Sequence, residues 1–146
     1  MAQKHQVLVI DDELSMRELL EIVLENAGYT VLTAQDAKGG IAILQKEQVD
    51  AVITDLYMGN DREAGMKVLA WIQDSASGTP AIMMTAHGSV ERAVEAMRLG
   101  AFDYIQKPFK NDEIKLRVQR AIEQQTLKRE NTALRKDEAN RARIDN

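Results

Sequence analysis

The chain has 146 residues, of which 45% are hydrophobic, with two prolines, eight glycines and no cysteine. These numbers suit one compact domain with a sizeable core, and they exclude a disordered chain, a disulfide framework and sites built on thiolates. The net charge of -4 is uneven, because residues 1–114 hold 10 basic and 18 acidic groups whereas residues 115–146 hold nine and five.

The acidic body is unsuited to binding nucleic acid, because phosphate groups would be repelled. We interpret the basic tail as a solvated helix face, so we expect no direct nucleic acid binding by this chain. The N-terminus passes from His5 into a five-residue apolar run closed by acids, which is too short for a signal peptide or a membrane span. We therefore expect a cytoplasmic protein without a membrane partner.

The chain alternates between predicted strands and predicted helices. A strand at Gln6–Ile10 is followed by a helix that opens at Ser15 and Glu18, spaced as in a capping box. Helical spacing predicts one buried face on this helix, made of Met16, Leu19, Leu20, Val23, Leu24 and Ala27. Further strands are expected at Tyr29–Ala34, Ala51–Asp55, Ala81–Thr85 and Phe102–Gln106, and further helices at 36–47, 66–74, 90–99 and from Asn111 onward. Five such pairs predict an α/β fold with a doubly wound, five-stranded parallel sheet.

Polar side chains collect at the carboxyl ends of the predicted strands, where open α/β sheets place their ligands. They are Asp11 and Asp12 after the first strand, Asp55 at the end of the third, Thr85 at the end of the fourth and Lys107 after the fifth. Two like charges about 4 Å apart repel by about 4 kcal/mol at an effective dielectric near 20. A cation bound by the three carboxylates removes this cost, and oxygen ligands without His or Cys favour Mg²⁺. The alternative is a cluster that stays partly protonated.

The expected metal ion, the Lys107 ammonium and the Thr85 hydroxyl together indicate a site for phosphoryl transfer. Mg²⁺ and Lys107 would neutralise phosphoryl oxygens, and Thr85 would donate one hydrogen bond to them. No glycine-rich loop follows the first strand, so neither a nucleotide phosphate site nor a dinucleotide site fits. The sequence suggests no separate general base or substrate pocket, which leaves Asp55 as the expected nucleophile and phosphoacceptor.

These residues resemble the receiver domain of bacterial two-component response regulators. The matching segments are Asp11–Asp12, Thr54–Met58 around Asp55, Thr85–Ala86 and Lys107–Phe109, and the resemblance runs from about residue 7 to residue 121. It implies a flavodoxin-like sheet with strand order 2-1-3-4-5 and a phosphoryl group donated by a sensor histidine kinase. It also implies that the chain is no enzyme, beyond assisting its own phosphorylation and dephosphorylation.

The same resemblance implies how the metal is held. Asp12 and Asp55 would bind Mg²⁺ directly, Asp11 would do so largely through water, and the backbone carbonyl of Tyr57 would complete the protein ligands. The family also implies that Lys107–Pro108 is a cis peptide.

The resemblance further implies a switch. When Thr85 moves toward the phosphate, the aromatic ring at Tyr104 would fill the space that it leaves. The face formed by the fourth helix, the fifth strand and the fifth helix then changes shape, which biases a two-state element.

Residues 85–105 resemble, more narrowly, the nitrogen-regulator class of enhancer-binding activators that work with the sigma-54 polymerase. Those proteins add an ATPase domain and a DNA-binding domain after the receiver, whereas this sequence ends at Asn146. We expect either a fragment of a longer regulator or a protein that acts through a partner.

The sequence departs from the family pattern after Asp55. Gly59 stands where a proline is usual, and the glycine suited to opening the third helix is Gly65, ten residues beyond Asp55. The loop Met58–Ala64 is therefore expected to be about two residues longer than usual and more mobile.

The last helix is predicted to extend beyond the domain. We expect a receiver domain at residues 1–122 and a linker or dimerisation helix at residues 123–146. Leu127, Asn131 and Leu134 have the spacing of a short zipper, with leucines at d positions and Asn at an a position, and this pattern favours a homodimer. An exposed linker helix is the alternative.

Two other function classes stay open at this point. One is a receiver-like adaptor that dimerises permanently through its C-terminal helix, without phosphate. The other is a phosphatase of the haloacid dehalogenase type, which also uses an Asp at a strand end but expects an acid where Tyr57 stands.

Overall fold

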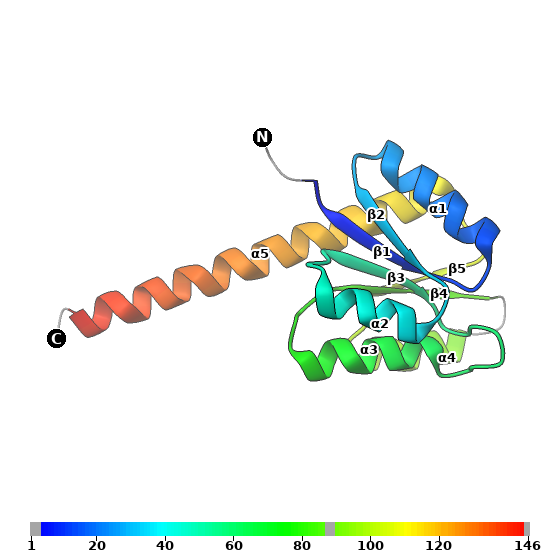
Figure 1. Ribbon diagram of the computed structural model, residues 1–146. Coiled ribbons are helices and arrows are strands. Elements are labelled where there is room, and N and C mark those ends of the chain that lie inside the picture. The colour runs from blue at the N-terminus through cyan, green and yellow to red at the C-terminus, as the bar shows by residue number, and fades with distance from the viewer. Residues whose placement is uncertain (1–3, 87–89, 145–146) are drawn as a thin grey trace.

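The computed structural model describes residues 4–86 and 90–144, with side chains described as far as Lys128. Strands and helices alternate along these residues (Figure 1). The strands are β1 (Gln6–Ile10), β2 (Thr30–Ala34), β3 (Ala51–Asp55), β4 (Ala81–Thr85) and β5 (Asp103–Gln106). The helices are α1 (Leu14–Asn26), α2 (Ala37–Lys46), α3 (Ala64–Ser75), α4 (Val90–Arg98) and α5 (Asn111–Ile144).

The five strands form one parallel sheet in the order β2-β1-β3-β4-β5, which confirms the flavodoxin-like fold predicted from the sequence. The interior strands β1 and β3 carry nearly unbroken apolar runs, because helices cover both of their faces. Val7 to Ile10 and Ala51 to Ile53 have no exposed surface. This burial fixes the register that brings the ends of neighbouring strands to one edge.

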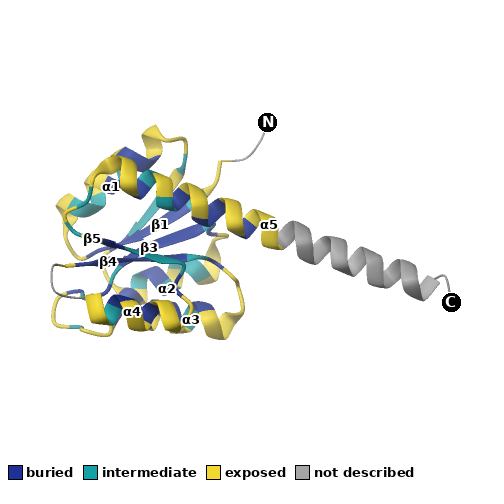
Figure 2. Ribbon diagram, turned by 180° about the vertical axis from the view of Figure 1, so that it is seen from behind, coloured by how far each residue is buried: buried dark blue, intermediate teal, exposed yellow. Residues whose placement is uncertain are grey.

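Helices α1 and α5 lie on one face of the sheet, and α2, α3 and α4 lie on the other (Figures 1 and 2). Each face has its own core. On the first face, Leu20 and Leu24 of α1 and Ile114 and Val118 of α5 pack against strand residues such as Ile53. On the second face, helical residues such as Val68, Leu69, Ala93 and Ala96 pack against Leu8, Val52 and Met83.

Helix α1 differs in two ways from its prediction. It begins at Leu14, one residue before Ser15, and its N-cap residue Glu13 makes no side-chain cap. The capping box predicted at Ser15 and Glu18 is therefore wrong: the Asp11 carboxylate instead accepts the Glu13 N–H at 2.9 Å and starts the turn earlier.

The buried face of α1 is also narrower than predicted. Leu20, Val23 and Leu24 are buried, whereas Leu19 is 42% exposed. Leu19 lies at the border of the helical stripe, and Ala27 is exposed because it follows the last helical turn.

Helix α5 continues well beyond the sheet, as predicted, and projects from the body of the domain (Figure 1). Among its residues up to Lys128, whose side chains are described, Ile122 and Gln125 are the last buried ones, and Leu127 is 64% exposed. The side chains of Asn131 and Leu134, the other two predicted zipper positions, lie outside the described residues. Within the described part of the chain, no helix combines the length and the apolar character that a membrane crossing requires.

Candidate functional site

The polar residues singled out in the sequence meet at the carboxyl edge of the sheet. Asp11 and Asp12 directly follow β1. Asp55 is the last residue of β3, Thr85 is the last residue of β4, and Lys107 is the first residue after β5. The register explains the convergence: β3 lies between β1 and β4, with Ile10 paired to Thr54 and Asp55 paired to Met84.

Lys107 is bonded to two of the carboxylates. Its Nζ lies 2.8 Å from Asp55 Oδ2 and 3.0 Å from Asp11 Oδ2. The Lys107 side chain is 17% exposed and the Asp11 side chain is fully buried. The backbone N–H of Lys107 also donates to the Thr85 carbonyl at 2.7 Å, which fixes the end of β5 against the end of β4. The ammonium is thus held over the pocket by both its side chain and its backbone.

The charges in this pocket are not fully balanced. Burial raises the pKa of Asp55, and the hydrogen bonds and charge of Lys107 together with the Tyr57 N–H only partly oppose that shift. Burial also disfavours the charged ammonium of Lys107, but hydrogen bonds and charge from Asp55 and Asp11 outweigh it and raise the Lys107 pKa. The charge of Asp11 also raises the Asp55 pKa, and a cation beside these carboxylates would oppose both effects.

The acidic residues have the geometry of a cation site. One oxygen from each of Asp11, Asp12 and Asp55 lies within 4.8 Å of the other two. The Tyr57 N–H donates to Asp55 Oδ1 at 3.2 Å and the Gly59 N–H donates to Asp12 Oδ2 at 2.8 Å, so backbone donors orient two of the carboxylates. An all-oxygen donor set with one exposed member fits a hard cation such as Mg²⁺, which keeps several waters.

The Thr85 hydroxyl lies within this edge without a partner. Thr85 has no exposed surface, and its Oγ1 makes no hydrogen bond to any residue that the structure describes. A buried hydroxyl without a partner costs about 1–3 kcal/mol by mutational data. Thr85 therefore has an unused donor close to the carboxylates.

We expect Thr85→Val to leave the free energy of unfolding unchanged or to raise it by up to about 1 kcal/mol, because it removes the unpaired hydroxyl and keeps the branched shape. The matched control is Thr54→Val. Thr54 is equally buried, but its hydroxyl donates to the Asp55 carbonyl at 3.1 Å, so this change should cost about 1 kcal/mol. Urea unfolding of the three chains measures both effects, and an equal loss in the two variants would contradict the assignment.

Tyr104 lies farther from the carboxylates than the other predicted residues. The register pairs Met83 with Tyr104 and Thr85 with Gln106, which places Tyr104 diagonal to Thr85 on the same face of the sheet. The tyrosine is half-buried and packs against the core under α4. The predicted cis peptide at Lys107–Pro108 is present.

Sequence reasoning missed two contacts at the site. Arg17, on the second turn of α1, donates from its guanidinium to the Asp11 carbonyl at 2.7 Å. Gly59, identified in the sequence as a departure from a family pattern, provides the N–H that holds Asp12. A basic residue six positions after an acid was a weak signal for the first contact; a backbone donor has no sequence signal at all.

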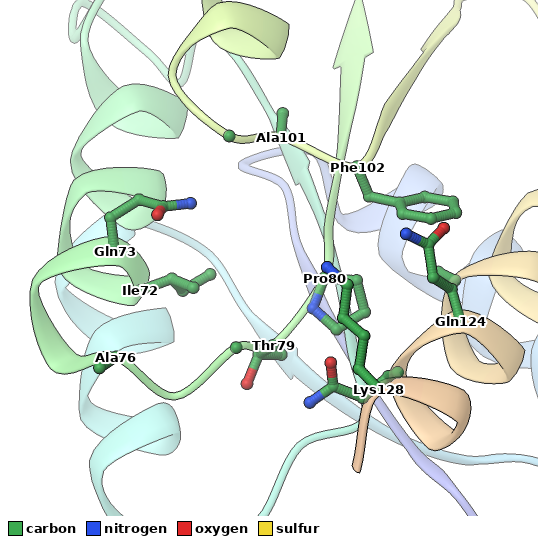
Figure 3. Close-up of a pocket in the computed structure, with 13 residues that line it drawn as sticks. Ile72, Gln73, Ala76, Thr79, Pro80, Ala101, Phe102, Gln124 and Lys128 are labelled. Atoms are coloured by element: carbon green, nitrogen blue, oxygen red, sulfur yellow. The ribbon is translucent and has the colours of Figure 1, made fainter. Parts of the chain in front are cut away.

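A hollow of about 640 Å³ lies at the other end of the strands, between α3, α5 and the segments that precede β4 and β5 (Figure 3). Its larger lining residues are Ile72, Gln73, Pro80, Phe102, Gln124, Gln125 and Lys128, and the others are small. None of the residues that line it is acidic, and it contains no candidate nucleophile beside a base. The acidic edge is therefore the better candidate for chemistry.

Known proteins share this fold and a substantial part of this sequence. Residues 7–119 match the family model described as the response regulator receiver domain. A putative NtrX-like response regulator of Rickettsia felis is 37% identical over 88% of this chain and 27% of its own length. The transcriptional regulatory protein GlrR of Escherichia coli is 39% identical over 81% of this chain and 26% of its own length.

Among solved structures, NtrX from Brucella abortus superimposes with a TM-score of 0.84 at 36% identity, covering 90% of this chain and 30% of that one. The chain thus spans between a quarter and a third of the length of these relatives. The family model covers most of the sequence, including every residue brought to the acidic edge. The chain belongs to the response regulator receiver domain family.

Proposed function

We propose that this receiver accepts a phosphoryl group on Asp55 from the phosphohistidine of a sensor histidine kinase. In that transfer the N–P bond to the histidine breaks and a bond forms between phosphorus and a carboxylate oxygen of Asp55. The observation that carries the proposal is the position of Asp55, a carboxylate at a strand end in contact with Lys107 and beside two further acids. Receiver domains are signalling domains, and we propose that this one only assists its own phosphorylation and dephosphorylation.

The residues around Asp55 would have separate roles in this transfer. Asp11, Asp12, Asp55 and the Tyr57 carbonyl would hold Mg²⁺, which supplies charge neutralisation for the phosphoryl oxygens when it is bound. Lys107 offers a second positive charge to those oxygens without having to move far, since its ammonium already lies 2.8 Å from Asp55. The two Asp55 oxygens have different partners, because the Tyr57 N–H donates to Oδ1 and the Lys107 ammonium contacts Oδ2.

The phosphate can change the shape of the domain through Thr85. Its hydroxyl lacks a partner among the described residues, so a phosphoryl oxygen at Asp55 would give it one. Movement of Thr85 would free space that Tyr104, diagonal to it on the sheet, is placed to fill. The affected surface is formed by α4, β5 and α5, and α4 presents three apolar side chains there: Val90, Val94 and Met97, which are 42%, 41% and 37% exposed.

This surface and the tail suggest the partners. We propose that residues 1–122 act as the receiver, that residues 123–146 act as a linker or dimerisation helix, and that phosphorylation controls homodimerisation. Leu127, Asn131 and Leu134 remain the proposed contacts of that helix. In a longer regulator the output would be an ATPase domain and a DNA-binding domain that activate sigma-54-dependent transcription, in keeping with relatives named NtrX and GlrR.

Acetyl phosphate with Mg²⁺ tests the acceptor. We expect intact-protein mass spectrometry to find one added phosphoryl group on the parent chain and none on Asp55→Asn, because the amide cannot form an acyl phosphate. Asp74→Asn removes the same charge from an exposed position near the end of α3 and should be modified like the parent. Full modification of Asp55→Asn would disprove the proposed acceptor.

The same samples separate the second candidate, a phosphate-independent adaptor. This alternative is favoured by the length of α5, which runs to Ile144, beyond the sheet on which its first turns pack (Figure 1). Light scattering should show an association state that changes with phosphate if the receiver switches. A dimer of constant size, with or without phosphate, would favour the adaptor.

A further inference from the structure

The loop between β3 and α3 forms a small hairpin. The backbones of Met58 and Asp61 exchange two hydrogen bonds, of 3.1 and 2.9 Å, around a turn in which Gly59 has φ +58°. The Asp61 carboxylate accepts the Glu63 N–H at 2.9 Å and pairs with Lys67 at 2.8 Å. The longer loop predicted from the sequence thus has its own hydrogen-bonded structure and holds Gly59 and Glu63 in fixed relation.

One end of this hairpin contacts the acidic pocket. The Gly59 N–H donates to Asp12 Oδ2 at 2.8 Å, although the two residues are 47 positions apart. Asp12 is the exposed member of the carboxylate cluster. Its side chain would lose more rotational freedom on binding a metal than the buried Asp11 would, so a donor that fixes it in advance favours binding.

The other end of the hairpin contacts α4. Glu63 Oε1 lies 2.7 Å from an Arg92 nitrogen in the first turn of α4, and the other guanidinium branch lies 2.6 Å from Glu95 of the same helix. Arg92 therefore has one partner on the loop and one on its own helix. A continuous series of contacts joins Asp12 to α4 through Gly59, the hairpin and Glu63.

We propose that Arg92 and Glu63 are positioning residues for the metal site: their ion pair holds the hairpin so that the Gly59 N–H orients the Asp12 carboxylate. Because coupling between two sites is reciprocal, a metal held by Asp12 also restrains the first turn of α4. Occupation of the metal site would then prepare the face that carries the output. This inference rests on the proposed Mg²⁺ site and assigns a role to residues outside it.

Three single variants separate positioning from simple charge effects. Arg92→Gln removes a positive charge, so long-range electrostatics alone would tighten Mg²⁺ binding, whereas loss of positioning weakens it. Glu63→Gln removes the loop partner. Glu95→Gln is the matched control, because it removes the same charge and the other partner of Arg92 without touching the loop.

The measurement is the dissociation constant of Mg²⁺, from isothermal titration calorimetry or from amide shifts of the folded variants. We expect Arg92→Gln and Glu63→Gln to bind Mg²⁺ about two- to fivefold more weakly than the parent, the range that a partly exposed ion pair supports. Glu95→Gln should stay near the parent value. Hydrogen exchange gives a second readout: Mg²⁺ should slow exchange in α4 of the parent and of Glu95→Gln, and not in the other two.

Two results would overturn the inference, and they have different meanings. If the parent binds Mg²⁺ and Arg92→Gln binds it equally or more tightly, the positioning role is wrong and the metal site stands. If the parent binds no Mg²⁺ at all, the proposed site fails and this inference fails with it.

Discussion

Lys107→Ala should fold, but its free energy of unfolding without metal should fall by about 2–4 kcal/mol, because a buried charge that loses its partner is strongly destabilising. The Asp11 side chain is fully buried and that of Asp55 is 13% exposed, and both carboxylates contact the same ammonium. We expect a loss near the low end of the range for broken buried ion pairs, because Asp12 is exposed and water can reach the site there. Mg²⁺ should restore part of the loss, because at the proposed site it would bind only the folded pocket. Urea unfolding with and without Mg²⁺ measures both effects.

The same variant should break the link between phosphate and shape. Phosphorylated by acetyl phosphate, the parent should show shifted amide signals in α4 and α5, and Lys107→Ala should not, because the phosphate then lacks the cation that connects the ends of β3 and β5. Lys110→Ala removes an equal charge from an exposed position three residues on and should behave like the parent. If phosphorylated Lys107→Ala still shifted the signals of α5 as the parent does, the role given to the lysine would be wrong.

The fold could be predicted because its signals are local and repeated. The interior strands β1, β3 and β4 are short apolar runs, and helices with an apolar stripe separate the strands along the chain. Parallel topology then brings the strand ends to one edge. Asp11, Asp55 and Lys107 could therefore be expected to meet, although they are far apart in the sequence, and they do lie in contact.

The contacts that escaped prediction depend on details that a periodic pattern does not encode. The Gly59 N–H reaches Asp12 only because the loop turns back at residues 58–61, and such a turn is set by backbone angles rather than by a side-chain pattern. The ion pair between Glu63 and Arg92 depends on how α3 and α4 are placed beside each other. The spacing of Ser15 and Glu18 wrongly predicted a capping box. The Asp11 carboxylate accepts the Glu13 N–H, α1 begins at Leu14, and Ser15 therefore lies inside the helix.

Gly65→Ala should destabilise the domain by about 1–3 kcal/mol, the range for overpacking, although alanine favours a helix over glycine by about 1 kcal/mol. Gly65 is the second residue of α3 and is buried. A Cβ there would lie 2.7 Å from the Asp55 carbonyl oxygen and 2.8 Å from the Leu56 Cα. Both atoms belong to the backbone, so no side-chain rotation relieves the overlap. The strand end that carries Asp55, or the start of α3, must move instead.

The displacement should also be visible in the chemistry of Asp55. We expect Gly65→Ala to be phosphorylated by acetyl phosphate more slowly than the parent even where both are fully folded, because its overlap falls on the carbonyl of Asp55, the proposed phosphoacceptor. Gly39→Ala is the matched control: it is also helical, and its Cβ would lie 3.0 Å from Oδ1 of Asp36, the side chain that caps α2 by accepting the Gly39 N–H at 2.7 Å. A side chain and not the backbone has to shift there, and the higher helix propensity of alanine offsets a weakened cap. That variant should change stability little and leave phosphorylation unchanged. Equal stability of Gly65→Ala and the parent would mean that α3 can shift away from β3 without loss, so the close approach would not be what requires glycine at this position.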